Sequence, residues 1–209
     1  MKVLGIILAL VALQNFALAA DPAPTPVPSP APVSKLEGHW SQYCQNGALR
    51  EEVFQGANVS LLEKKFSDPA CTNLEVVTAS AGTFESDTEF HEPDQSTFNM
   101  DFTFAAVKIT LLSDRYVIYF IDHQMCGLKD WKKGEVREIS GMQCAFVQGG
   151  LPIPVPKKGD MRYGIYKIDT NGRLYFGHLM HGYDGTSPQR RPYLLDARYF
   201  VKLAQAPLL

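Results

Sequence analysis

One segment of the sequence alternates strictly between large apolar and small or polar side chains, and this alternation limits the fold more than any other feature. From Phe98 to Ala105, Phe and Met occupy every second position, and Asn, Asp, Thr and Ala occupy the positions between them. Successive side chains of a β-strand point to opposite faces, so residues 97–112 are predicted to form a strand with one wet face. Its large apolar residues would fill much of a narrow barrel, and they are Phe98, Met100, Phe102 and Phe104.

Shorter β-compatible segments occur on both sides of this strand. Segments 48–55 and 59–66 flank a Gly-Ala-Asn turn, and segments 161–169 and 173–180 flank Thr-Asn-Gly, so each pair is predicted to be a hairpin. Other strands are expected at 37–44, 74–84, 135–139 and 197–203. Short strands at regular spacing with tight turns predict an all-β fold, an antiparallel up-and-down barrel.

Residues 114–125 fit a short helix that lies across one mouth of this barrel. Ser113 or Asp114 can cap its amino end, and Gly127 can stop it. The β-branched and aromatic residues between Arg115 and Ile121 leave a strand as the alternative.

The amino-terminal segment is predicted to lie outside the folded domain. A single lysine, an apolar run and small residues at 17–20 are typical of a signal peptide over residues 1–20, and the run is too short for a membrane span. Proline at every second position of 21–34 predicts an extended linker, with a proline-rich ligand as the alternative. Residues 35–209 would then form one secreted or periplasmic domain, with no transmembrane span after cleavage.

All four cysteines follow the predicted signal peptide. An even number in an exported chain predicts two disulfides. Zinc is the competing interpretation, but no pair of cysteines is two to four residues apart. Four cysteines allow three connectivities, and we prefer Cys44–Cys71 with Cys126–Cys144 because each closes a short loop.

The first half of the domain resembles a known family. The residues that carry the resemblance are Gly38, Trp40, Ser41, Cys44, Arg50, Phe54, Phe66, Asp68, Cys71 and Gly82. On these residues, 36–84 is similar to the domain of the adenomatosis-polyposis-coli down-regulated protein family and to small bacterial exported proteins with lipocalin-like domains. A looser similarity to the bacterial proteins covers 126–131 and 191–199. The resemblance implies a lipocalin-like barrel, a Cys44–Cys71 disulfide and binding of an apolar group.

The same resemblance assigns structural roles at the start of the domain. Gly38 would admit close backbone approach, and the Trp40 indole would plug the closed end of the barrel. An arginine of the closing segment, Arg198 or otherwise Arg191, would pack over the indole face as a cation. The alternative is that both arginines are solvated.

Two glycines bear on whether the barrel has room for a ligand. Gly164 and Gly177 interrupt predicted strands, and a glycine inside a strand marks a bend or a close approach. If both face inward opposite the apolar row, they leave room for a narrow apolar chain; barrel curvature is the alternative. The predicted ligand-binding residues are Phe102, Phe104, Gly164, Gly177 and Tyr199.

Motifs for catalysis are absent from the sequence. There is no Gly-x-Ser-x-Gly, phosphate loop or dinucleotide fingerprint, and the disulfides would use every thiol. His178, His181 and Asp184 form the best metal candidate, but histidines three apart on a strand face opposite ways. A formal net charge of −2 argues against a nucleic-acid partner.

We therefore expect a protein that is not an enzyme and that needs neither a cofactor nor a metal. The first hypothesis is an exported module that binds an apolar small molecule or lipid group in the barrel. The second is a structural or protein-interaction module of the cell envelope with a filled barrel and an unknown protein partner.

Overall fold

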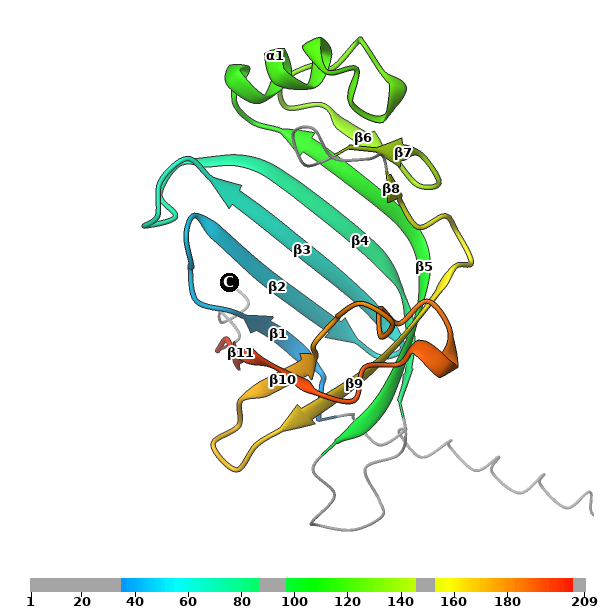
Figure 1. Ribbon diagram of the computed structural model, residues 1–209. Coiled ribbons are helices and arrows are strands. Elements are labelled where there is room, and N and C mark those ends of the chain that lie inside the picture. Colours follow the sequence, from blue (N-terminus) through cyan, green and yellow to red (C-terminus); the bar gives the residue numbers. More distant parts are fainter. Residues whose placement is uncertain (1–34, 87–96, 146–152, 205–209) are drawn as a thin grey trace, which may run out of the picture. The chain divides into compact units, whose positions relative to one another are not determined.

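The computed structural model describes residues 35–86, 97–145 and 153–204, and its main feature is a closed β-barrel (Figure 1). Eight antiparallel strands follow one another in the ring β1-β2-β3-β4-β5-β9-β10-β11, and β11 pairs back onto β1. Their bounds are β1 Gly38–Ser41, β2 Ala48–Gln55, β3 Asn58–Phe66, β4 Leu74–Ser86, β5 Phe98–Leu111, β9 Met161–Ile168, β10 Leu174–Gly177 and β11 Leu195–Lys202. The predicted all-β antiparallel barrel is confirmed. The predicted signal peptide and proline-rich linker lie outside the described residues.

Both predicted hairpins are present. β2 and β3 pair from Gln55 and Asn58 outward, and Gly56 in the turn has a φ of +59°. β9 and β10 pair across a turn in which Gly172 has a φ of +73°. The left-handed φ is accessible to glycine without steric cost, so these turns form where the sequence places Gly.

The long strands β4 and β5 are in register except at one bulge. Gly82 pairs with Phe104, whereas the preceding residue of β4 pairs with Ala106, so β5 carries one extra residue there. A Cβ at Gly82 would lie 2.0 Å from the carbonyl oxygen of Thr103, so only glycine allows the two backbones to approach this closely. The extra residue shifts the alternation, and the row of large residues that begins at Phe98 continues on the inner face with Val107, Ile109 and Leu111.

A cap follows β5 (Figure 1). It consists of α1 Asp114–Asp122, η1 Met125–Gly127, β6 Val136–Glu138, β7 Gln143–Cys144 and β8 Ile153–Pro154. In this cap, α1 lies beyond the end of β5, and β6 pairs with the carboxyl-terminal part of β5. Ser113 caps α1, since its side chain accepts a hydrogen bond from the amide of Tyr116. The predicted helix is confirmed but ends before 125, because Gln124 adopts a left-handed conformation.

Two apolar clusters stabilise the described part of the chain. The closed-end cluster fills one end of the barrel with Leu36, Trp40, Phe54, Val59, Phe84, Tyr166, Leu174 and Phe200. The cap cluster joins the other end of β4 and β5 to the cap and contains Val76, Val107, Ile109, Leu111, Phe120, Met125, Cys126, Trp131, Ile139, Cys144 and Val155.

Both predicted disulfides form. Cys44–Cys71 joins the β1–β2 loop to the β3–β4 loop, and Cys126–Cys144 joins η1 to β7 inside the cap cluster. Each bridge closes a loop of modest length and contributes roughly 3 kcal/mol on a chain-entropy model. The helices within the described ranges include none with the length and apolar character needed to cross a membrane.

Candidate functional site in the barrel mouth

A cavity of about 1250 Å³ opens at the end of the barrel that faces α1. Its walls come from β2, β3, β4, β5, β11, the β1–β2 loop and α1. The closed-end cluster fills the opposite end, so the cavity occupies the half of the barrel that the core leaves free. Small-molecule sites typically measure about 300–1,000 Å³, so this cavity has room for such a ligand.

One wall of the cavity is apolar and aromatic. It is formed by α1 and by the inner face of β4 and β5, and it consists of Val76, Ile109, Tyr116, Tyr119 and Phe120. The rings of Phe120 and Trp131 meet edge to face with their centres 5.1 Å apart, which fixes α1 on the cap cluster. The wall therefore rests on the packed cap.

The opposite wall is charged. Arg50 on β2 and Glu63 on β3 are direct cross-strand partners, and Arg198 on β11 lines the same cavity. Phe54 belongs to the closed-end cluster, so the period of two places Arg50 on the inner face as well. This parity with Phe54 is the signal in the sequence that could have revealed the wall. Arg50 and Glu63 are not among the ligand-binding residues predicted above.

The Arg50 guanidinium has only loose partners. Its Nε lies 3.4 Å from Glu63 Oε1 and its Nη2 lies 3.9 Å from Glu52 Oε1. Both pairs are close enough for charge attraction, but the buried Nε makes no hydrogen bond of acceptable geometry to any described residue. A guanidinium with an unused donor in a cavity is available to a ligand.

Glu52 lies beneath the charged wall, on the inner face of β2. It pairs with Trp40 and Leu61 of the neighbouring strands and is only 6% exposed. The pKa of Glu52 is raised to about 7. Burial is the main cause, the positive charge of Arg50 partly offsets it, and the negative charge of Glu63 adds to it. Close to neutral pH, Glu52 therefore exists in both protonation states.

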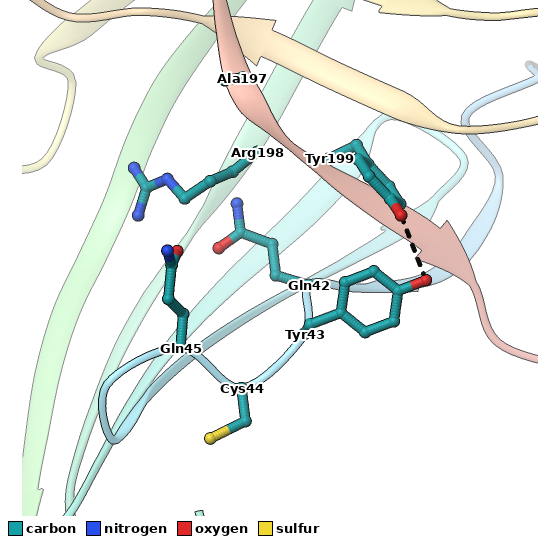
Figure 2. Close-up of a pocket in the computed structure, with 7 residues that line it drawn as sticks. All are labelled: Gln42, Tyr43, Cys44, Gln45, Ala197, Arg198 and Tyr199. Atoms are coloured by element: carbon teal, nitrogen blue, oxygen red, sulfur yellow. Dashed lines mark hydrogen bonds between the residues drawn. The ribbon is translucent and has the colours of Figure 1, made fainter. Parts of the chain in front are cut away.

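A smaller hollow of about 310 Å³ lies at the rim and shares three residues with the large cavity. Figure 2 shows Gln42, Gln45 and Arg198 on one side, and Tyr43 and Tyr199 on the other. The hydroxyls of Tyr43 and Tyr199 share a hydrogen bond over 3.4 Å, and this contact raises the pKa of Tyr43. Because the hollow is an extension of the rim, we take the larger cavity as the candidate site.

The two phenylalanines expected to bind ligand lie on the inner face of β5 as packing residues. Their rings meet edge to face with centres 4.4 Å apart. Phe102 packs against the closed-end cluster, and Phe104 packs against the cap cluster. Neither belongs to the lining of the mouth cavity.

The other predicted ligand residues are also outside the mouth cavity. Gly164 is paired with Met100 on the inner face. Gly177 does not face inward, because a Cβ there would lie 2.8 Å from Pro192 and 3.0 Å from Ile165, so the condition for room opposite the apolar row is not met at this position. Gly177 follows the core-packed Phe176, so the alternation of β10 directs it outward. Tyr199 lies on the outer face, where Arg173 stacks on its ring at 4.6 Å.

Trp40 is the closed-end anchor that the sequence predicts, but its cation is a lysine. Its indole Nε1 donates to the carbonyl of Leu36 over 2.6 Å, and Lys202 Nζ lies 5.3 Å from the centre of the ring. Lys202 is the direct strand partner of Trp40. Gly38 has a φ of +116°, and a Cβ there would lie 2.8 Å from the Lys202 stem, so glycine makes room for it.

The expected position of Arg198 over Trp40 is therefore wrong. Arg198 precedes Lys202 by four residues, which is roughly 13 Å along a strand, and it pairs instead with Asp196 at 2.8 Å. The other candidate, Arg191, pairs with Asp101 at 2.6 Å.

The histidine candidate for a metal does not assemble. His178 lies 3.9 Å from Asp196, and Asp184 binds Arg190 at 2.5 Å. Within the three described ranges, no three His, Cys, Asp or Glu residues come together in a way that could hold a metal ion.

Fold and cavity together define a small antiparallel barrel with one packed end and one open end whose walls differ in polarity. Searches of protein-family models and of curated proteins found no match to the chain. The function is therefore argued from the site itself.

Proposed function

We propose that this protein is an exported, non-enzymatic binding module that holds an amphipathic small molecule in the mouth of its barrel. The observation that carries the proposal is the cavity of about 1250 Å³ with an aromatic wall opposite a charged wall. A ligand with an apolar part and a polar part would match both walls. The resemblance to lipocalin-like domains supports this by analogy.

Secretion or a periplasmic location is part of the proposal. The predicted signal peptide supports it, and so do the two disulfides, which are typical of an oxidising compartment. A lipid group remains a suitable ligand. Its apolar part would lie against α1, since the closed end of the barrel is filled by side chains.

A protein-interaction module is the second candidate. It is favoured by large apolar side chains that are exposed on the loop between β10 and β11, namely Leu179, Tyr183, Tyr193 and Leu194. The filled closed end is compatible with both a ligand-binding module and a protein-interaction module. A test of ligand binding in the mouth cavity therefore distinguishes the two.

The decisive measurement is binding of a neutral apolar probe, N-phenyl-1-naphthylamine, by protein that has been stripped of bound lipid. In a Trp40→Phe variant, Trp131 is the remaining tryptophan, and it contacts Phe120 of the aromatic wall. We expect saturable binding, seen both in probe fluorescence and in energy transfer from Trp131.

Matched variants test whether the probe occupies the mouth cavity. Thr78→Phe places a ring inside the cavity and should abolish saturable binding, since Thr78 lines it. Ala79→Phe places the same ring on the outer face of β4, opposite Leu62 and Lys108, and should leave binding unchanged. Equal binding by the two variants, or no saturable binding by the wild type, would reject the ligand-binding function and favour the interaction module.

A further inference from the structure

Five cations line the cavity, and they differ in how well they are paired. Arg115 forms an ion pair with Glu75, Lys64 binds Glu51 at 2.7 Å, Arg198 binds Asp196 at 2.8 Å, and Lys65 lies over the ring of Tyr116. Arg50 is the least well paired, because its nearest carboxylate oxygens are 3.4 and 3.9 Å away, its guanidinium carbon lies 6.0 Å from the centre of the Phe200 ring, and its buried Nε makes no hydrogen bond to a described residue. Buried polar groups are normally satisfied, so this deficit needs an explanation.

The groups around Arg50 are arranged for a carboxylate. Glu63, whose side chain is half exposed, places a carboxylate oxygen 3.4 Å from Arg50 Nε. Asp196 and, further away, Glu63 raise the pKa of Arg198, so Glu63 also acts on the second arginine of the wall. Glu63 thus shows that a carboxylate can lie beside the Arg50 guanidinium, although with poor hydrogen-bond geometry.

Resting on the function proposed above, we propose that the ligand is an apolar organic acid whose carboxylate binds Arg50, with Arg198 adding a second positive charge. The acid would enter with its head group towards Glu52 and leave its apolar part against α1. A ligand carboxylate can approach the guanidinium fork in the bidentate geometry that Glu63 does not achieve.

Glu52 and Glu63 bear on the charge of this subsite from β2 and β3. Burial raises the pKa of Glu52 to about 7, so near neutral pH this carboxyl is partly uncharged and opposes an incoming carboxylate less. Glu63 is a built-in competitor for Arg50. Removing its charge should therefore improve binding of an acid, which a purely structural role of the pair would not do.

Two ligands of equal chain length isolate the contribution of the carboxylate. Dodecanoate and dodecanol are compared by displacement of N-phenyl-1-naphthylamine from stripped protein. We expect dodecanoate to bind about tenfold or more tightly than dodecanol, because a charge-assisted hydrogen bond contributes at least that factor. Arg50→Gln should remove the preference by weakening dodecanoate binding more than dodecanol binding.

Further variants keep the test independent of how well Arg50→Gln folds. Arg198→Gln, at a half-exposed position, should reduce the preference for dodecanoate, and Glu63→Gln should increase it. Arg173→Gln is the control, since it removes an arginine that stacks on Tyr199 on the outer face, and it should have no effect.

The possible outcomes separate this inference from the function on which it rests. If dodecanol and dodecanoate bind equally, or if Glu63→Gln weakens binding of dodecanoate, the acid subsite is wrong while the binding function stands. If neither compound displaces the probe and the probe itself does not bind, the binding function fails and the acid subsite fails with it.

Discussion

Replacing Glu52 by Gln should make the protein more stable, and only at neutral and alkaline pH. The side chain is buried inside the barrel, and burial raises its pKa from 4.5 to about 7. At about pH 5 to 6 the folded protein therefore holds a proton that the unfolded chain has released. The free energy of unfolding must fall as the pH rises through this window, and it stays low above about pH 7.

The size of the effect follows from the difference between the two pKa values. One pKa unit corresponds to about 1.4 kcal/mol, so the ionised Glu52 costs the folded state about 3 kcal/mol at pH 8. Gln has nearly the same shape as protonated Glu and cannot ionise. The variant should match the wild type near pH 4.5, where Glu52 is protonated in the folded state, and exceed it by up to about 3 kcal/mol at pH 8.

The measurement is urea unfolding of both proteins from about pH 5 to pH 8, with the free energy of unfolding extrapolated to water. Glu63→Gln is the control, because the Glu63 side chain is half exposed and its charge stays hydrated. If wild type and Glu52→Gln lose stability in parallel over this range, the ionised Glu52 is tolerated inside the barrel and the reasoning fails.

Two further changes test the packing of the closed end and the bulge. Lys202→Met combined with Trp40→Leu in a double-mutant cycle should give a coupling of about 0.5–2 kcal/mol for the cation over the indole, and strict additivity would argue against the contact. Gly82→Ala should lower the melting temperature, since its Cβ would lie 2.0 Å from a carbonyl oxygen of β5 and overpacking of this kind costs at least about 1–3 kcal/mol; an unchanged melting temperature would refute the close approach.

The fold could be predicted because its determinants are local in the sequence. The strict alternation from Phe98 identifies β5, and Gly56 and Gly172 identify turns that need a left-handed φ. Helix α1 was harder to predict, because its β-branched residues also fit a strand. It forms because Ser113 caps it and because Phe120 is buried in the cap cluster.

The site could not be predicted in the same way, because β2 carries charges on both faces. Glu51 faces outward and binds Lys64, while the adjacent Glu52 faces inward, and no local alternation of polarity distinguishes them. Only the parity with Phe54 separates the two faces. That parity becomes informative once Phe54 is known to lie in the closed-end cluster.

Which cation packs over Trp40 depends on the register between β1 and β11. The spacing of residues in the sequence does not give this register. Arg198 and Lys202 lie on the same face of β11, so alternation allows either to approach the barrel interior. Pairing of Trp40 with Lys202 selects the lysine and leaves Arg198 at the mouth. The same register therefore supplies both the closed-end cation and a cation of the candidate site.

The inner row of β2 contributes both to the closed-end cluster and to the wall of the candidate site. It passes from Phe54 in the core, through Glu52, to Arg50 in the cavity wall, a distance of roughly 13 Å. A ligand cannot pass Glu52 towards the closed end, because the closed-end cluster fills the space beyond it. If its carboxylate reaches Arg50, its apolar part must point outward, and in that direction the cavity offers the aromatic wall of α1. The cap is therefore part of the candidate site, and its disulfide and core hold the aromatic surface in place.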